Sequence, residues 1–261
     1  MMAESITALT TAQISKLSTG QINVLSNAQL QAIETADLQK LTNEQVQAIT
    51  TAGIKALTVD QVSNFTTAQI AALTTGQAKA LTADQIVGLT TAQVSKLTED
   101  QLKAMTTAQI KVIATDDVKA LTAAQLQAIT SDGIKALTVD QMAVITTAQI
   151  SNLLDAQVSK LSVTQLQALA SDSLRALTET QIQAITTTGI KGLALDQVAS
   201  LTTKQLAALN TDLVRDHPDY VCRVTSDEGD VGSAHRAKFQ DVETETPVIL
   251  TTSQLLTTGV D

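Results

Sequence analysis

A leucine or isoleucine returns every eight residues along most of this chain. The series begins at Leu9 and reaches Leu209 without a slip. A second apolar series follows five residues after the first, beginning at Ile14. Residues 9–208 therefore form 25 octads in a single register, and a repeat of this kind limits the possible folds more than any other feature. Two members of the first series are neither Leu nor Ile: Phe65 and Met105.

No continuous secondary structure has a period of eight residues. Eight residues turn an α-helix by about 800°, which is about 80° beyond two full turns, so an apolar stripe would circle the helix. In a strand, two positions that are five residues apart point to opposite faces. Each octad is therefore expected to contain one short element and one break.

The polar residues of the octad identify that element as a helix. We number the octad so that the Leu of the first series, such as Leu9, is position 1. Position 2 is Ser or Thr in 20 of the 25 octads, and position 5 is Gln in 19. This spacing is the capping box of a helix start, in which the hydroxyl and the Gln each bind the other residue's backbone N–H. Positions 1 and 6 then become the two apolar partners of a hydrophobic staple.

The charged residues indicate a helix in every octad. All 15 acidic residues of the array occupy positions 2 to 5, and 12 of its 13 bases occupy positions 7 or 8. Lys204 is the exception. Acids near a helix start and bases near its end are favoured by the helix macrodipole, by roughly 0.3–1 kcal/mol each. One long helix would show this bias only at its two ends, so we expect a separate helix in each octad.

The predicted fold is an all-α solenoid, or superhelix, with one very short helix per octad. Helices of about six residues are unstable alone, so they must stack on their neighbours and bury positions 1 and 6 in a shared core. We expect a lead-in at 1–8, the solenoid at 9–214 and a non-repeat tail at 215–261. Alanines at positions 4 and 8 are expected to allow close approach of the helices: Ala12, Ala28, Ala56 and Ala104.

A longer repeat is superimposed on the octad. "AITTAGIKALTVDQV" from Ala48 reappears in closely similar form from Ala128 and Ala184. The spacings are whole multiples of eight, as expected of duplications that kept the register. Two interpretations of the glycine at position 5 remain open: a capping box without one partner, or a local bend of the solenoid. The glycines concerned are Gly53, Gly133 and Gly189.

Composition and charge exclude several classes of protein. The net charge is −9, and no basic stripe or set of stacking aromatics is present, so we expect no nucleic-acid binding and no attachment to anionic lipid. No apolar stretch is long enough for membrane insertion. The start of the chain lacks the features of a Sec signal peptide, which leaves a cytoplasmic location open. A single cysteine, Cys222, reveals little about the redox compartment.

The segment 215–261 differs in kind from the array. It is acidic and contains both histidines, both prolines and the only tyrosine. It is expected to be a partly disordered tail with some β character at 220–224, and the alternatives are a small cap on the solenoid or an out-of-frame remnant. A thiol pair or metal site could be imagined from four of its residues, but their spacing matches no zinc pattern. We therefore interpret them as incidental: His217, Asp219, Cys222 and His235.

No pattern in the chain predicts catalysis. We find no phosphate loop, paired catalytic carboxylates or Ser-His-Asp arrangement, so we expect no enzyme activity, no cofactor and no metal site. The position-4 aspartates could form a calcium ladder, but their intermittent occurrence favours helix-start electrostatics. Thr at position 3 fills 12 octads. Exposed Thr could bind ice or carbohydrate, but irregular occupancy favours a tolerated surface residue.

The octads "LTTAQISKL", "LTTGQAKAL" and "LTADQIVGL" resemble the octapeptide arrays of large repetitive bacterial surface and secreted proteins. The resemblance covers about residues 6–209 and transfers no site residues. It implies a spacer, stalk or adhesin-like role outside the cell or at its surface. The alternative from another class is a scaffold for protein partners or for self-association, since solenoids offer extended surfaces. The uniformity of positions 3 and 7 favours the stalk.

Overall fold

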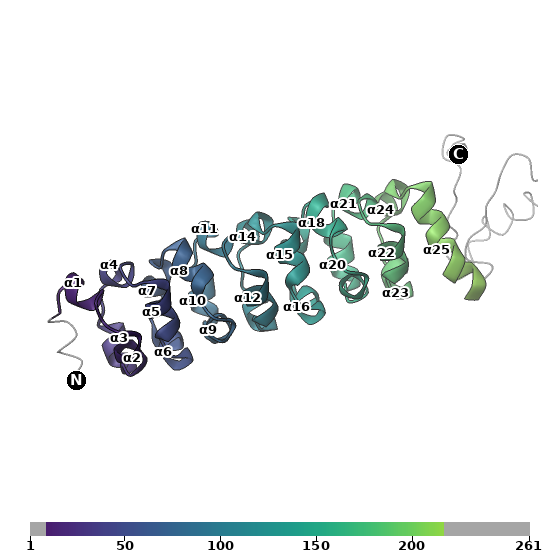
Figure 1. The fold of residues 1–261 in the computed structure, drawn as a ribbon. Coiled ribbons are helices and arrows are strands. Elements are labelled where there is room, and N and C mark those ends of the chain that lie inside the picture. The colour runs from purple at the N-terminus through teal and green to yellow at the C-terminus, as the bar shows by residue number, and fades with distance from the viewer. Residues whose placement is uncertain (1–8, 217–261) are drawn as a thin grey trace, which may run out of the picture.

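The computed structural model describes residues 9–216, and this part of the chain is entirely helical, with one helix per octad (Figure 1). The first 24 helices have four to six residues each, which confirms the predicted short helices. The helices are α1 Thr11–Ile14, α2 Thr19–Asn23, α3 Asn27–Gln31, α4 Thr35–Leu38, α5 Asn43–Ala48, α6 Thr51–Ala56, α7 Val59–Ser63, α8 Thr67–Ala72, α9 Thr75–Ala80, α10 Ala83–Val87, α11 Thr91–Val94, α12 Glu99–Ala104, α13 Thr107–Lys111, α14 Thr115–Ala120, α15 Ala123–Ala128, α16 Ser131–Ala136, α17 Val139–Ala143, α18 Thr147–Ser151, α19 Asp155–Val158, α20 Val163–Ala168, α21 Ser171–Arg175, α22 Glu179–Ala184, α23 Thr187–Lys191, α24 Leu195–Ser200 and α25 Thr203–Asp216.

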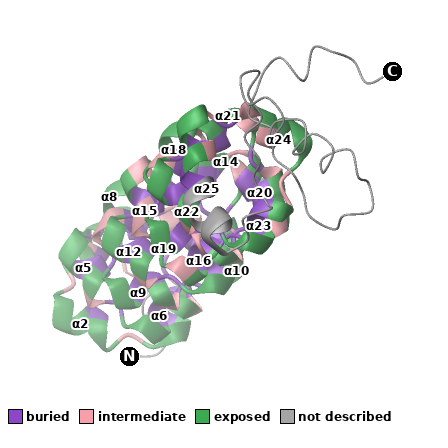
Figure 2. Cartoon of the chain, turned by 90° about the vertical axis from the view of Figure 1, so that its right-hand side faces the viewer, coloured by how far each residue is buried: buried purple, intermediate pink, exposed green. Residues whose placement is uncertain are grey.

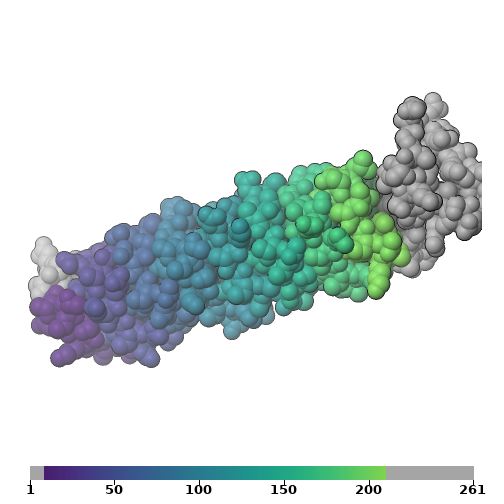
Figure 3. Space-filling model, turned by 90° about the horizontal axis from the view of Figure 1, so that it is seen from above, coloured from purple at the N-terminus to yellow at the C-terminus, as the bar shows by residue number. Residues whose placement is uncertain are grey.

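The helices wind into a superhelix with three helices, or 24 residues, in each turn. The helix pairs in closest contact are three apart along the chain, such as α9 with α12 and α13 with α16. Successive turns stack into an elongated rod (Figures 1 and 3). The predicted solenoid is confirmed, but each helix packs mainly on the third helix along, not on the next one. Successive helices are joined by tight turns and therefore make little contact with each other. Helices stacked in adjacent turns face each other along their length.

Positions 1 and 6 form the core of the rod, as predicted. From Ile33 to Ile185 every residue of the position-1 series is buried, and position 6 is buried from Ile14 to Ile190. Figure 2, seen towards the C-terminal end of the rod, shows buried residues inside and exposed residues outside. In the first turn Leu9, Leu17 and Leu25 are only half-buried, because within the described residues no turn precedes them.

The alanines of positions 4 and 8 differ in their burial. Ala56 and Ala104, at position 8, are half-buried, whereas Ala12 and Ala28, at position 4, are exposed. Positions 3, 4 and 5 form the first helical turn, and of these only position 5 points inward, so that position 4 faces solvent. The expectation for position 4 was therefore wrong.

At two places a valine at position 3 of one turn lies against a glycine at position 8 of the next. A Cβ added at Gly88 would collide with Val59, and a Cβ added at Gly192 would collide with Val163. Both valines stand 29 residues before the glycine they cover. At these two places a valine in one turn is accommodated by the missing side chain of a glycine in the next, whereas the residue 29 positions after Val139 is Ala168.

The last helix departs from the octad pattern. Helix α25 continues for 14 residues, from Thr203 to Asp216, past the expected boundary of the array at residue 214. The next position 5 is Leu213 and not Gln. This octad therefore lacks the residue that, in other octads, accepts from the backbone N–H at the helix start. The remainder of the tail lies outside the described residues.

Candidate functional site

Sixteen of the 25 described helices begin with a complete capping box, as the spacing of Ser or Thr and Gln predicts. In α11 the Thr90 N–H donates to Gln93 Oε1 at 2.8 Å, and the Gln93 N–H donates to Thr90 Oγ1 at 3.3 Å. Two of the four backbone donors that a helix start leaves free are involved in such a box. Where the cap is Leu154, the side chain cannot accept, and only the backbone N–H donates to Gln157 Oε1, at 2.8 Å.

An acid in the first helical turn accepts further hydrogen bonds at the helix start. In α5, hydrogen bonds from its own backbone N–H and from the Thr42 hydroxyl lower the pKa of the Glu44 carboxyl. This agrees with the preference of acids for helix starts.

From Gln45 onward the buried glutamines also bind the preceding turn of the superhelix. The Nε2 of Gln93 donates to the carbonyl oxygens of Val62, Ser63 and Phe65 at 3.2, 3.1 and 2.7 Å. These carbonyls belong to the end of α7 and the turn after it, where a helix leaves its last acceptors free. We call this set of bonds from Nε2 the glutamine clamp. One amide group thus completes the start of its own helix and the end of a helix in the turn before.

The glutamine clamp recurs along the rod with the same spacing. Sixteen of the position-5 glutamines donate to the carbonyl 28 residues earlier, at 2.6–2.9 Å. All of these glutamines are at least nine-tenths buried. Their burial between turns is consistent with hydrogen bonding of every polar atom they carry.

A second row of amides joins the turns from the opposite direction. Gln31 Nε2 donates to Ala56 O at 2.7 Å and Gln47 Nε2 to Ala72 O at 2.8 Å, in each case 25 residues later. These position-7 side chains are exposed. They lie at the rim of the interface between turns, whereas the glutamine clamps lie in its interior.

Sequence reasoning found the capping box and missed the clamp, although the sequence contains a signal for it. Position 5 is never Glu in the 25 octads, whereas Glu and Gln serve equally in a capping box. Glu can accept from the cap N–H but has no donor for the carbonyls of the preceding turn. The preference for Gln over Glu at position 5 is therefore the sequence signal of the turn-to-turn contact.

The glycines at position 5 retain half of the capping box. Gly53 N–H donates to Thr50 Oγ1 at 3.0 Å, which supports the interpretation of a box without its second partner. A Cβ added at Gly53 would lie 2.6 Å from Leu30 Cδ1 and 2.9 Å from Ile49 Cγ2. Apolar side chains thus fill the space that a Gln occupies elsewhere.

The exposed threonines of position 3 do not form a continuous face. Thr67, Thr91 and Thr115 are stacked in three successive turns, and Val139 and Val163 follow in the next two. No other row of position-3 Thr in the described turns is longer. This arrangement provides short rows, each interrupted by other side chains.

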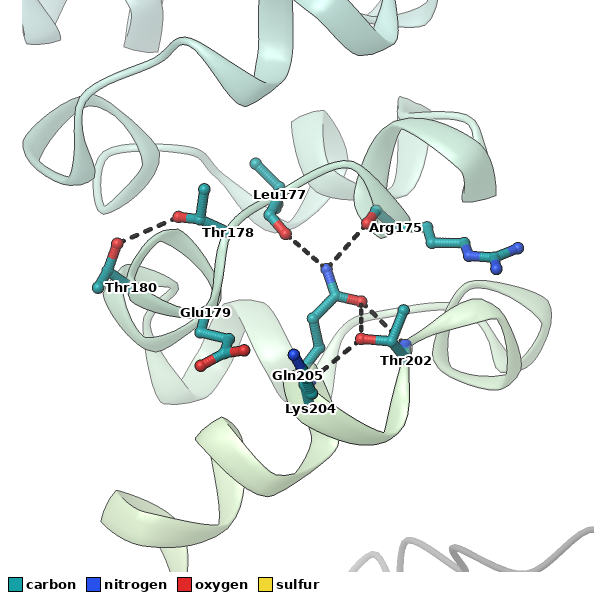
Figure 4. Close-up of a pocket in the computed structure, with 8 residues that line it drawn as sticks. All are labelled: Arg175, Leu177, Thr178, Glu179, Thr180, Thr202, Lys204 and Gln205. Atoms are coloured by element: carbon teal, nitrogen blue, oxygen red, sulfur yellow. Dashed lines mark hydrogen bonds between the residues drawn. The ribbon is translucent and has the colours of Figure 1, made fainter.

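A surface cavity of about 380 Å³ lies where helices α22 and α25 begin. It is lined by three charged side chains, Arg175, Glu179 and Lys204, and by threonine hydroxyls (Figure 4). In its wall Gln205 Nε2 donates to Leu177 O at 2.7 Å. Lys204, the one base outside positions 7 and 8, is therefore a cavity residue. The mixed charges favour no single class of ligand.

The four tail residues considered for a thiol pair or metal site lie outside the described part of the chain: His217, Asp219, Cys222 and His235. Within residues 9–216, no group of three or more His, Cys, Asp or Glu side chains could hold a metal ion. In the same residues no helix combines the length and apolar character needed to cross a membrane.

Comparison with protein families identifies the repeat. The model of the ALTTAQ repeat matches residues 30–67, 64–91 and 110–147. The chain thus contains an array of ALTTAQ-type octapeptide repeats, and the register of these segments continues through the octads on either side. Comparison with curated proteins finds no match.

Proposed function

We propose that this chain is a non-enzymatic structural spacer or stalk, part of a bacterial surface or secreted repeat protein. The observation that carries the proposal is the repetition of one interface along the rod. Gln61, Gln101 and Gln141 bind the preceding turn through equivalent atoms. A rod built in this way can gain or lose octads without a new kind of contact, so its length is set by the number of repeats. The bacterial surface location rests on the resemblance of the repeats.

The spacer function is tested by changing length and surface independently. Removal of six octads shortens the rod by two turns, or about 18 Å if stacked helices are about 9 Å apart. A second variant keeps all octads but replaces the exposed residues at positions 3 and 4 by those of "LTTAQISK", and leaves position 7 unchanged because its glutamines join the turns. In the native host, we expect the shortened chain to lose function and the resurfaced chain to keep it. Small-angle scattering verifies both lengths.

A protein-binding scaffold is the second candidate, and the cavity beside Lys204 favours it. A scaffold predicts the reverse pattern, in which the resurfaced chain loses function. Arg175→Ala with Lys204→Ala alters the cavity without touching the core or the capping boxes. If a stoichiometric partner bound the native chain and not this variant, the spacer proposal would be overturned.

A further inference from the structure

Three turns of the rod have lost two of their three glutamine clamps. At the first turn position 5 carries Asp37, Gln45 and Gly53; at the second, Asp117, Gln125 and Gly133; and at the third, Ser173, Gln181 and Gly189. All other octads carry Gln at this position. These turns, α4–α6, α14–α16 and α21–α23, are called seams below. The losses are thus paired within single turns and not scattered along the rod.

Hydrogen bonding across the middle seam is correspondingly sparse. Only Gln125 crosses it, with two bonds from Nε2, to Ser95 O at 3.0 Å and Leu97 O at 2.7 Å. In the next full turn, α17–α19, three glutamines make eight such bonds to the turn before. Asp117 is buried, but a carboxylate has no amide hydrogens to donate.

The other seam residues replace the clamp only in part. Ser173 Oγ donates to Ile145 O at 3.3 Å, which is one long bond in place of two or three. A Cβ added at Gly133 would meet Ile129 Cγ2 at 2.5 Å and, from the preceding turn, Ile110 Cγ1 at 3.6 Å. An apolar contact there fills space without binding the carbonyl groups of the preceding turn.

The first helix of each seam has also lost its cap hydroxyl. The N-cap residues of α4, α14 and α21 are Glu34, Ala114 and Ala170, and none of them makes a side-chain cap bond. Replacing a Ser or Thr cap typically weakens a helix. A weak helix start and a weak interface therefore coincide in the same turn.

We propose that the rod opens first at its three seams, and that the clamped helices between them, α7–α13 and α17–α20, open later as cooperative blocks. In a repeat array the stability is close to a sum of repeat and interface contributions, so the interfaces with the fewest bonds open at the lowest free energy. Opening at a seam would lengthen the rod at a defined place while the blocks remain folded. Lengthening of the rod under a pulling force would matter only if the chain is the spacer proposed above. The order in which the turns open does not depend on that function.

Amide hydrogen exchange on the full chain tests the seams directly. The double variant Ala114→Thr with Asp117→Gln restores both the cap and the clamp of α14. The new Nε2 would face the carbonyls of Ile86, Val87 and Leu89, at the same spacings that Gln93 uses. In the native chain we expect amides of α14–α16 to exchange at least tenfold faster than those of α8–α12. The double variant should slow the exchange of α14–α16 at least tenfold and leave the exchange of α21–α23 unchanged. Equal exchange along the native rod, or no change in the variant, would overturn the proposal.

Two control variants separate the clamp from the cap and from the buried carboxyl group. Leu154→Thr adds a cap hydroxyl to α19, where Gln157 already makes its clamp, and should slow exchange in α19 alone. Asp117→Asn introduces an amide on a side chain one methylene too short for the clamp, and should have less than a third of the effect of Asp117→Gln. Equal effects of Asn and Gln, or a slowing by Leu154→Thr that spreads to neighbouring turns, would show that the clamp is not responsible.

The seams and the spacer function can fail separately. Uniform exchange would remove the seams and leave the dependence of function on octad number untouched. A patterned exchange profile combined with function that is insensitive to octad number would overturn the spacer and retain the seams.

Discussion

Gln93 Nε2 donates to the carbonyl oxygen of Phe65 at 2.7 Å, across 28 residues of sequence. The same side chain accepts from the Thr90 N–H through Oε1. Two levels of structure, the short helix and the superhelix, therefore depend on one amide group. Because Oε1 accepts within the helix start and Nε2 donates to the preceding turn, substitutions can remove one contact and keep the other.

Gln93→Glu should separate the cap from the clamp. Glu keeps the acceptor for the Thr90 N–H, but it removes the donor and places a carboxylate beside three buried carbonyl oxygens. We expect the free energy of unfolding at pH 7 to fall by about 1–3 kcal/mol. The surroundings should raise the folded pKa of the introduced carboxyl above its unfolded value of about 4.3. The loss should therefore be largest above the folded pKa and shrink as the pH falls towards 4.

The matched control for this substitution is Gln21→Glu. Gln21 makes the same capping box, with Ser18 N–H to Gln21 Oε1 at 2.8 Å, but its side chain is exposed and it makes no clamp bond within the described residues. This variant should unfold in urea within about 0.5 kcal/mol of the native chain. Equal losses for the two variants would contradict the assignment of the clamp.

Neighbouring core and cap residues should differ in their contribution to stability. Leu89 is 5% exposed in the shared core, and Leu89→Ala should cost about 2–5 kcal/mol because it opens a cavity. Thr90→Ala removes only the cap hydroxyl and should cost about 0.5–2 kcal/mol. Urea unfolding of the two variants measures the difference, and equal costs would argue against the staple.

Glycine-to-alanine substitutions should have opposite effects at two helical positions. A Cβ at Gly133 would lie 2.5 Å from Ile129 Cγ2, so Gly133→Ala should destabilise the rod by about 1–3 kcal/mol through overpacking. At exposed Gly76 the nearest atom would be 3.6 Å away. Gly76→Ala should therefore stabilise the chain by up to about 1 kcal/mol, through helix propensity alone. Thermal unfolding reports both signs, and a stabilising Gly133→Ala would contradict the packing described here.

Deletions should be tolerated by whole octads and not by fractions of one. Removal of residues 89–104 deletes two octads and joins Gly88 to Met105 in register. Gln109 would then stand 28 residues after Phe65 and could take over the clamp of Gln93. We expect a folded, shorter rod by circular dichroism and small-angle scattering.

A deletion of four residues from the same region is the comparison. It shifts position 5 of the next three octads out of register with the carbonyls of the turn before the deletion, whereas later octads keep their spacing. The array should therefore divide into two weakly coupled parts. A cooperative thermal transition as sharp as that of the 16-residue deletion would exclude the octad as the structural unit.

The local features of this fold could be read from single octads. The Thr-to-Gln spacing at residues 90 and 93, and the Leu-to-Val spacing at 89 and 94, predict a capped and stapled helix because all four residues interact within one turn of chain. The charge pattern supports the same helices. The short helix, its start and its two core positions were therefore determined by sequence alone.

The stacking of the turns was decided only by the tertiary structure. Three helices complete a turn because of the angles between successive helices, and no local spacing encodes those angles. The superhelix leaves position 4 exposed, where close approach was expected. It also brings Gln93 against Phe65, and at Gly53 it places Leu30 where other octads have a Gln side chain. Both contacts join residues more than 20 positions apart, so they exist only after the superhelix has brought the turns together.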